Sequence, residues 1–342
     1  MVVSFLKPSR RLSVPAEIAR WLIPRLIIRG GLLFAVLGLV FVAIDWLPGN
    51  AASAILGANR TPEALAALER NLNLDKPLMA RFLSWLGSAF AGDFGTSVNG
   101  VPIINLLSSA LPVTLATTGM AFLVTAVLSV AIAIFWASRA EKPWISHIID
   151  RSTVALIALP EFVVGVFLVA VFSLWLGWFP AVTITAEGLP TQISMYALPV
   201  MALVIPQAAW NSRMLFAAFE DASHNTAVRN AELNGIVGNQ LALRHILPLS
   251  APTFATSMAT TAGVLVAGTV TVEALFNHPG VGLLVSNAVA QRDISVILAV
   301  LAVTGAIILV LLTVADAIKV AFTPKAVSYT HLRAHETPEH IV

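Results

Sequence analysis

Only a few side chains in this chain could act on a solute, because most ionisable groups lie outside its long apolar stretches. Glu161 is an exception, since it stands within an apolar segment, where an ionisable group is costly. Gln207 and Asn211 are four residues apart, which places both amides on one face of a helix. Together the three could line a polar path for a solute. Two structural roles compete with this one: Glu161 could pair with Arg151 or Arg139, and the amides could hydrogen-bond between helices.

The residue combinations typical of enzymes do not occur in the sequence. It has no G-x-S-x-G nucleophile motif, no H-E-x-x-H metal motif and no G-x-x-x-x-G-K-[ST] phosphate loop. It also has no cysteine, which excludes thiolate metal sites and thiol catalysis. We therefore predict a protein that is not an enzyme and that holds no cofactor or metal. Glu273 is expected to organise the turn at Pro279 and Gly280 rather than to meet a solute.

The elements that position these residues follow from the composition. Of the 342 residues, 58% are hydrophobic and only 11% are charged, and the mean hydropathy is +0.86. The charges are clumped and leave uncharged stretches at 94–138, 162–186, 188–212, 245–272 and 294–315. A helix that crosses a bilayer needs about 20 apolar residues. The chain is therefore predicted to be an all-α, polytopic membrane protein, and a soluble enzyme, a disulfide scaffold and a disordered chain are excluded.

Charge gaps, prolines, glycines and aromatic flanks predict six transmembrane helices. Their ranges are 26–45, 112–136, 153–175, 197–216, 251–272 and 295–318. The first also fits the apolar region of a signal peptide, but no small-x-small cleavage site follows Ile44, and Arg25 and Arg29 could snorkel to extend the span. We therefore expect this helix to be retained.

The distribution of basic residues predicts the orientation of the helices. Of the 20 Lys and Arg residues, 14 fall on the side that holds the N-terminus and five on the opposite side. Both termini are thus predicted to be cytoplasmic. The expected regions are a cytoplasmic segment 1–25, a transmembrane domain 26–318 with an external loop 46–111 and a cytoplasmic loop 217–250, and a cytoplasmic end 319–326.

The last residues, 327–342, break the composition abruptly and contain three histidines, His331, His335 and His340. These histidines could suggest a metal site. Residues 327–337 can, however, be reverse-translated into a sequence that resembles a sequencing-library adapter. We interpret 327–342 as a non-native tail and leave it out of the functional argument.

The most informative region is the polar cytoplasmic loop, whose residues 223–247 read SHNTAVRNAELNGIVGNQLALRHIL. Small and apolar residues at 227, 231 and 233, followed by Gly235, predict a short helix, a glycine turn and a second helix that leads to Pro248. A helix that carries small residues such as Ala231 suits a groove on a partner protein.

This loop resembles the EAA loop of membrane subunits of ATP-binding-cassette importers, in which E-A-A, three residues, G, nine residues and I-x-L-P follow one another. The frame falls on Arg229-Asn230-Ala231, Gly235 and His245-Ile246-Leu247-Pro248. Arg229 replaces Glu and His245 replaces Ile. Both departures, with Leu243-Arg244-His245, are similar to the dipeptide, oligopeptide and nickel branch of these importers.

Further segments resemble motifs of this branch in the same order along nearly the whole chain. They are Trp46–Asn50, Asn71–Pro77, Asp93–Ser97, Leu111–Leu115, Leu159–Phe162, Leu176–Pro180, Glu273–Gly282, Arg292-Asp293 and Asp316. Glu161 and the polar residues 1–20 depart from the pattern expected of the branch.

The resemblance implies a type I importer-like permease in the inner (plasma) membrane that forms half of a path for peptides or a related small solute such as nickel. It implies four kinds of partner: a homologous second permease, two cytosolic ATP-binding subunits, an external solute-binding protein and membrane lipid, but no nucleic acid. The ATPase-coupling residues would be Arg229, Ala231, Glu232, Leu233, Gly235, His245, Leu247 and Pro248. The alternative is a secondary transporter, which would need inverted repeats and paired mid-span carboxylates, and neither is visible.

Overall fold

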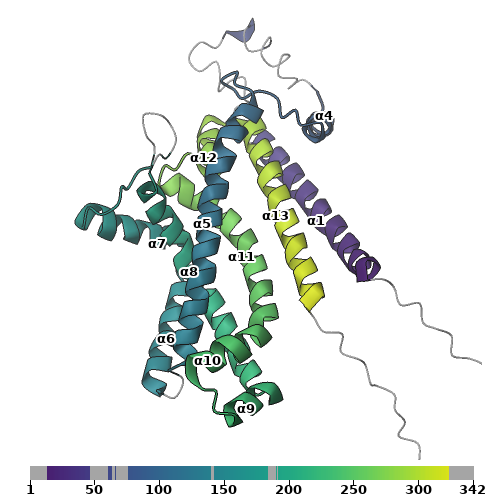
Figure 1. Ribbon diagram of the computed structural model, residues 1–342. Coiled ribbons are helices and arrows are strands. Elements are labelled where there is room, and N and C mark those ends of the chain that lie inside the picture. The colour runs from purple at the N-terminus through teal and green to yellow at the C-terminus, as the bar shows by residue number, and fades with distance from the viewer. Residues whose placement is uncertain are drawn as a thin grey trace, which may run out of the picture.

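The computed structural model describes residues 14–46, 61–63, 66, 76–139, 142–183, 190 and 192–322. Helices dominate this part of the chain, and the one β-bridge found in it joins Thr96 to Pro102. The larger helices are α1 (Val14–Asp45), α4 (Leu78–Phe90), α5 (Ile103–Ala137), α6 (Pro143–Ile157), α7 (Glu161–Leu168), α8 (Ser194–Ser223), α11 (Leu247–Leu275), α12 (Val281–Gln291) and α13 (Ile294–Phe322). Shorter ones are η1 (Val169–Trp175), α9 (Thr226–Leu233), α10 (Gly238–Leu241) and η2 (Ala242–Ile246) (Figure 1). The predicted all-α class is confirmed.

Four described helices are long and apolar enough to cross a membrane: Leu22–Ala43, Ile103–Ala137, Ala242–Leu275 and Ile294–Ile318. The bent pair Pro143–Ile157 and Glu161–Trp175 makes a fifth if it counts as one crossing. The fourth predicted span, 197–216, lies in α8, which is 30 residues long but carries the polar residues Gln207, Asn211 and Arg213. The count of six crossings and the cytoplasmic location of both termini stay predictions.

The third predicted span, 153–175, is not one straight helix. The helix α6 ends at Ile157, and the chain turns by 102° before Glu161–Trp175 continues. Pro160 causes the break, because it has no N–H to continue the helix and disfavours helical dihedrals in the residue before it. It takes the extended conformation, with φ −60° and ψ 146°. Glu161 therefore lies at a corner between two helices and not within a continuous span.

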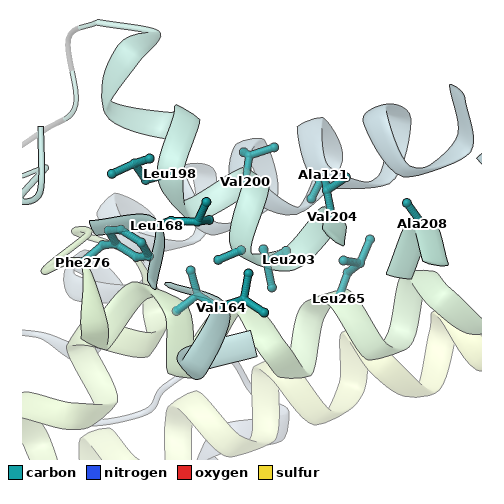
Figure 2. Packing of buried hydrophobic residues seen from close by; sticks show 12 residues of the cluster. Ala121, Val164, Leu168, Leu198, Val200, Leu203, Val204, Ala208, Leu265 and Phe276 are labelled. Atoms are coloured by element: carbon teal, nitrogen blue, oxygen red, sulfur yellow. The ribbon is translucent and has the colours of Figure 1, made fainter. Parts of the chain in front are cut away.

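The centre of the molecule is the contact of α5, α7, α8 and α11. Its buried cluster includes Val164, Leu168, Leu203, Leu265 and Phe276 (Figure 2). In lipid the helices gain little from hiding apolar surface, so close packing has to hold them together. Gly165 shows how close they lie, since a Cβ there would stand 2.6 Å from Cδ2 of Leu275.

A second group of helices pairs α1 with α13, side by side in Figure 1. Leu37 and Phe41 of α1 pack against Leu298 of α13 and Phe82 of α4. Arg29 Nη2 lies 2.7 Å from Asp316 Oδ2, so this arginine is paired within the protein. The first apolar segment is therefore a packed helix of the fold. The loop helices α9 and α10 lie at one end of the molecule, and α4 and α12 at the opposite end (Figure 1).

Several predicted regions fall outside the described residues. These are the terminal segments 1–13 and 323–342, which include the suspected tail, and residues 47–60, 64–65 and 67–75 of the external loop, which hold most of two quoted motifs. The short segments 140–141, 184–189 and 191 also lie outside the described residues. The domain boundaries drawn through them stay predictions.

Candidate coupling loop, pocket and outer turn

The loop between α8 and α11 is an ordered helical unit. The side chain of Asn225 caps α9 by accepting a hydrogen bond from the N–H of Ala227 at 2.9 Å. After α9, Gly235 takes φ +84°, a left-handed conformation that favours glycine. The chain then forms α10 and η2 and enters α11 at Leu247. The predicted helix, glycine turn and second helix are all present.

The loop has a small apolar core of its own. Val228, Ala231 and Leu241 are buried, and Ile236 and Ile246 pack against them. Ala231 is only 6% exposed. It therefore holds the two halves of the loop together and does not face outward, contrary to its expected fit into a partner's groove.

The outer face of the loop carries a different set of side chains. Leu233 is 80% exposed and Val237 is 69% exposed, although both are apolar. Arg229 and Glu232 are also exposed, on either side of buried Ala231. The exposure of Leu233 and Val237 leaves apolar surface that a partner protein could cover. Leu233 was among the predicted site residues, whereas Val237 was missed because its exposure depends on the turn at Gly235.

The loop core is continuous with the ends of the long helices. Ile246 packs both in the loop core and in a second cluster formed by Ala133 of α5 and Leu215 and Phe219 of α8, where Leu247 also packs. The hydroxyl of Ser250 donates to the carbonyl oxygen of Ala218 at 3.0 Å and so ties α11 to α8. A force on the loop therefore reaches three long helices through packed side chains. Of the remaining predicted residues, His245 is half-buried and Pro248 is exposed in the first turn of α11.

A pocket of about 430 Å³ lies at the corner between α6 and α7. The corner residues form one wall, α8 forms the second and α11 the third. The lining residues include Glu161, Gln207, Trp210, Thr260 and Val264. Glu161 and Gln207 thus come together at one cavity, as the prediction of a polar path requires. Trp210 and Thr260 were not singled out from the sequence, since nothing local distinguishes them.

Asn211 does not line the pocket. It is fully buried, and its side-chain amide donates to the carbonyl oxygen of Gln207 and to the hydroxyl of Thr261, both at 2.8 Å. Its side-chain oxygen accepts from the hydroxyl of Ser257 at 2.7 Å. Its bonds to Thr261 and Ser257 join α8 to α11, which is the helix-packing role considered for it, and its bond to Gln207 lies within α8.

Glu273 organises the outer turn between α11 and α12, as expected. It is fully buried, and its Oε2 accepts a hydrogen bond from the N–H of Gly282 at 2.6 Å. A Cβ at Gly280 would meet this carboxylate, and a Cβ at Gly282 would lie 2.3 Å from the carbonyl oxygen of Val270. Glycine is required at both positions because there is no room for a side chain.

His278 anchors the same turn and was not identified as important from the sequence. Its Nε2 lies 3.0 Å from the hydroxyl oxygen of Thr117 on α5, and its Nδ1 lies 2.7 Å from that of Thr183. The Thr117 hydroxyl already donates to the carbonyl oxygen of Val113, so it accepts from Nε2–H, and Thr183 donates to Nδ1. Burial lowers the pKa of His278 to about 4. The ring is therefore neutral at physiological pH.

Asp293 closes the outer end at the start of α13. Its Oδ2 accepts from the N–H of Val98 at 2.8 Å, and its Oδ1 accepts from the N–H of Val296 at 3.2 Å. One carboxylate thus caps α13 and also holds the segment before α5. Segments that are distant in the sequence are therefore neighbours in the structure.

The fold and these sites define a multi-pass helical transport protein. The family model described as "binding-protein-dependent transport system inner membrane component" matches residues 129–328, and the model of the N-terminal part of such components matches residues 18–117. The chain belongs to this family and is a permease subunit of an ATP-binding-cassette importer. It is not itself the ATPase, which is a separate subunit of these systems.

Named relatives match this protein over most of its length. The glutathione transport system permease protein GsiC of Shigella flexneri is 31% identical over 296 residues, which cover 85% of this chain and 94% of that protein. GsiC of Escherichia coli strain K12 is 30% identical over the same shares of both chains. A putative peptide permease protein of Brucella suis is 28% identical over 314 residues, which cover 90% of this chain and 98% of that protein. The predicted recognition of the family is confirmed.

Proposed function

We propose that the chain is one of two permease subunits in an ATP-driven importer of short peptides or of a related peptide-like solute. The names of the relatives, which specify glutathione and peptides, support this substrate class over nickel. A homologous second permease, two cytosolic ATP-binding subunits and an external solute-binding protein complete the assembly in this proposal.

The observation that carries the proposal is the mechanical continuity of the loop 223–248. Its exposed apolar residues Leu233 and Val237 form a contact surface, and its buried core is joined through Ile246 to the ends of α5 and α8. Closure of the ATPase subunits can therefore move packed helices as rigid bodies. One element that both sites bias is what coupling between distant sites requires.

The orientation follows from the same proposal. The loop helices lie in the cytosol, and α4, α12 and the outer turn lie on the external side, where the solute-binding protein docks. The excess of basic residues on the side of the N-terminus supports this direction. Six crossings with both termini in the cytosol then place α9 and α10 at the end of the molecule opposite α4, as they are in Figure 1. In this proposal Glu161 and Gln207 line the solute path, and Asn211 stabilises that wall through its hydrogen bond to the carbonyl oxygen of Gln207.

The test is uptake of labelled tri-alanine into proteoliposomes that contain the permease pair, the ATPase subunits and the binding protein. We expect uptake only when ATP is present on the side of the membrane that carries the ATPase subunits. The double variant Leu233→Glu/Val237→Glu should lower uptake and ATPase recruitment by about tenfold or more, because it places charges on a desolvated contact. The variant Met79→Glu, on exposed α4 at the other end of the molecule, is the matched control for ATPase recruitment, which it should leave unchanged. Uptake that persists without ATP, or that ignores the loop variant, refutes the proposal.

A further inference from the structure

We infer that the pocket at the α6–α7 corner binds a primary alkylammonium group of the solute in transit, with Glu161 as its counter-charge. This inference rests on the proposed import of peptides and adds to it a chemical group that the path selects.

The position of Glu161 is set by the break in the helix. Pro160 ends the preceding turn, and Glu161 is the first residue of α7 after the chain has turned by 102°. Its carboxylate reaches toward α11, since a Cβ on Gly268 would lie 3.4 Å from Oε1 of Glu161 and 3.2 Å from Leu203. Glycine at 268 thus leaves space for the carboxylate at the junction of α7, α8 and α11.

The carboxylate of Glu161 has no partner in the part of the chain that the structure describes. No hydrogen bond caps α7 through a side chain, and the ion pairs found among the described residues involve other acids. Asp150 is paired with Arg213, and Asp316 with Arg29. The pairing with Arg151 or Arg139 that was considered from the sequence is thus not formed. A carboxylate in an apolar, half-buried site is costly unless a cation meets it.

The walls of the pocket suit an ammonium group on a short organic chain. An alkylammonium offers three donors. Glu161, Gln207 and Thr260 line the same cavity, and each has a side-chain oxygen that can accept a hydrogen bond. The other walls are apolar or aromatic, and Trp210 is 48% exposed there, so an indole face is available to a cation and to alkyl groups. The volume of about 430 Å³ falls within the range of roughly 300–1,000 Å³ found for small-molecule sites.

The experiment compares uptake of three labelled peptides in the reconstituted importer: tri-alanine, N-acetyl-tri-alanine and N-acetyl-Ala-Lys-Ala. The first carries its ammonium at the N-terminus, the third carries it on a side chain, and the second has none. Each peptide is measured with the wild type and with Glu161→Gln. Because the binding protein is the same in both, the ratio of the two uptake rates cancels its own selectivity.

We expect Glu161→Gln to lower the uptake of tri-alanine by about tenfold, the effect of one lost charge-assisted hydrogen bond, and to change that of N-acetyl-tri-alanine by less than about twofold. If Glu161→Gln also lowers the uptake of N-acetyl-Ala-Lys-Ala, the site accepts any alkylammonium group. If the uptake of this peptide does not change, the site accepts only the ammonium group of the peptide N-terminus. Glu161→Asp should keep the preference, since the charge remains. The variant Glu161→Gln/Gln207→Glu moves the charge across the pocket and should restore part of it.

A role of Glu161 in folding alone gives a different pattern. Uniform loss or no change across the three peptides in Glu161→Gln, or no recovery in the charge-swap variant, overturns the subsite while ATP-dependent uptake by the wild type still upholds the proposed function. Absence of ATP-dependent uptake of all three peptides by the wild type overturns both. Recovery of the assembled complex and its ATPase rate are measured for each variant, so that a failure to assemble is recognised as such.

Discussion

The coupling loop and the outer turn both connect helices with the help of glycine, but they use it for opposite purposes. At Gly235 a Cβ would meet nothing within 4 Å, and the residue is needed for its φ of +84°. At Gly282 the backbone of Val270 leaves no room for a Cβ. The loop also exposes apolar side chains, whereas the outer turn buries the polar side chains of Glu273 and His278 and hydrogen-bonds them to groups of the same chain. One end therefore leaves apolar side chains open to a partner, as the proposed coupling requires, and the other end closes upon the chain itself.

The largest effect should come from filling the outer turn. In Gly282→Ala the new methyl group would overlap the carbonyl oxygen of Val270, 2.3 Å away, and α12 must move from α11. We expect a loss of about 3 kcal/mol in stability, measured by thermal unfolding in detergent. Gly119→Ala in α5 is the control, because no atom lies within 4 Å of its added Cβ. Equal melting temperatures for the two variants would contradict the difference drawn between the ends.

The second prediction separates the inside of the loop from its outside. Ala231→Arg places a charge in the loop core, and we expect it to cost about 2 kcal/mol in stability and to abolish recovery of the ATPase subunit. Leu233→Arg, two residues on, should leave the melting temperature unchanged and still lower ATPase recovery by about tenfold. Thermal unfolding and co-purification measure the two effects. A stable Ala231→Arg protein that only loses its partner would restore the outward-facing role of Ala231.

The third prediction concerns pH. The pKa of His278 is lowered by burial from 6.5 to about 4, so below pH 6.5 the unfolded chain binds a proton that the folded chain does not. Stability is therefore full above pH 6.5 and is lost as the pH falls toward 4. We expect a loss of about 2 kcal/mol between pH 7 and pH 5.

His278→Gln is the comparison for this prediction, since it keeps hydrogen-bonding groups but does not titrate. Two other ionisable residues contact His278: Tyr196, whose ring meets the imidazole edge-on, and Glu273, whose backbone carbonyl oxygen accepts from the N–H of His278. Both remain in the variant, so the part of the pH dependence that disappears belongs to His278. If thermal unfolding of wild type and variant changes equally between pH 7 and pH 5, the neutral His278 bridge does not carry the effect.

The smallest effect is expected at Gly235. Gly235→Ala meets no clash and only strains the backbone at φ +84°, which costs about 1 kcal/mol. Stability should fall slightly, and the ATP-driven uptake rate should fall by severalfold as the loop loosens. Gly235→Asn, a residue that tolerates this conformation, should come closer to the wild type. A large loss of stability in Gly235→Ala would indicate that space, and not conformation, demands glycine here.

Much of the fold followed from patterns along the chain. Apolar length and charge gaps located α1, α5, α8, α11 and α13, because a helix in lipid must satisfy its own backbone and present apolar side chains. The helices of the coupling loop followed from their small residues and Gly235. The bend before Glu161 was missed, although Pro160 signals it, because apolar residues continue on both sides and a span length was assumed to be unbroken.

The amino-acid sequence alone thus determined a multi-pass helical permease of its family, the position of the helical loop between α8 and α11, and the few polar residues worth testing. Periodicity, charge and motif spacing act locally, and for that reason they can be seen in one dimension. Only the tertiary structure decided that Ala231 points inward, that Asn211 holds helices together, and that Glu161 and Gln207 share a pocket. The partners of His278 are 161 and 95 residues away along the chain, and only helix packing brings such distant groups within hydrogen-bond distance.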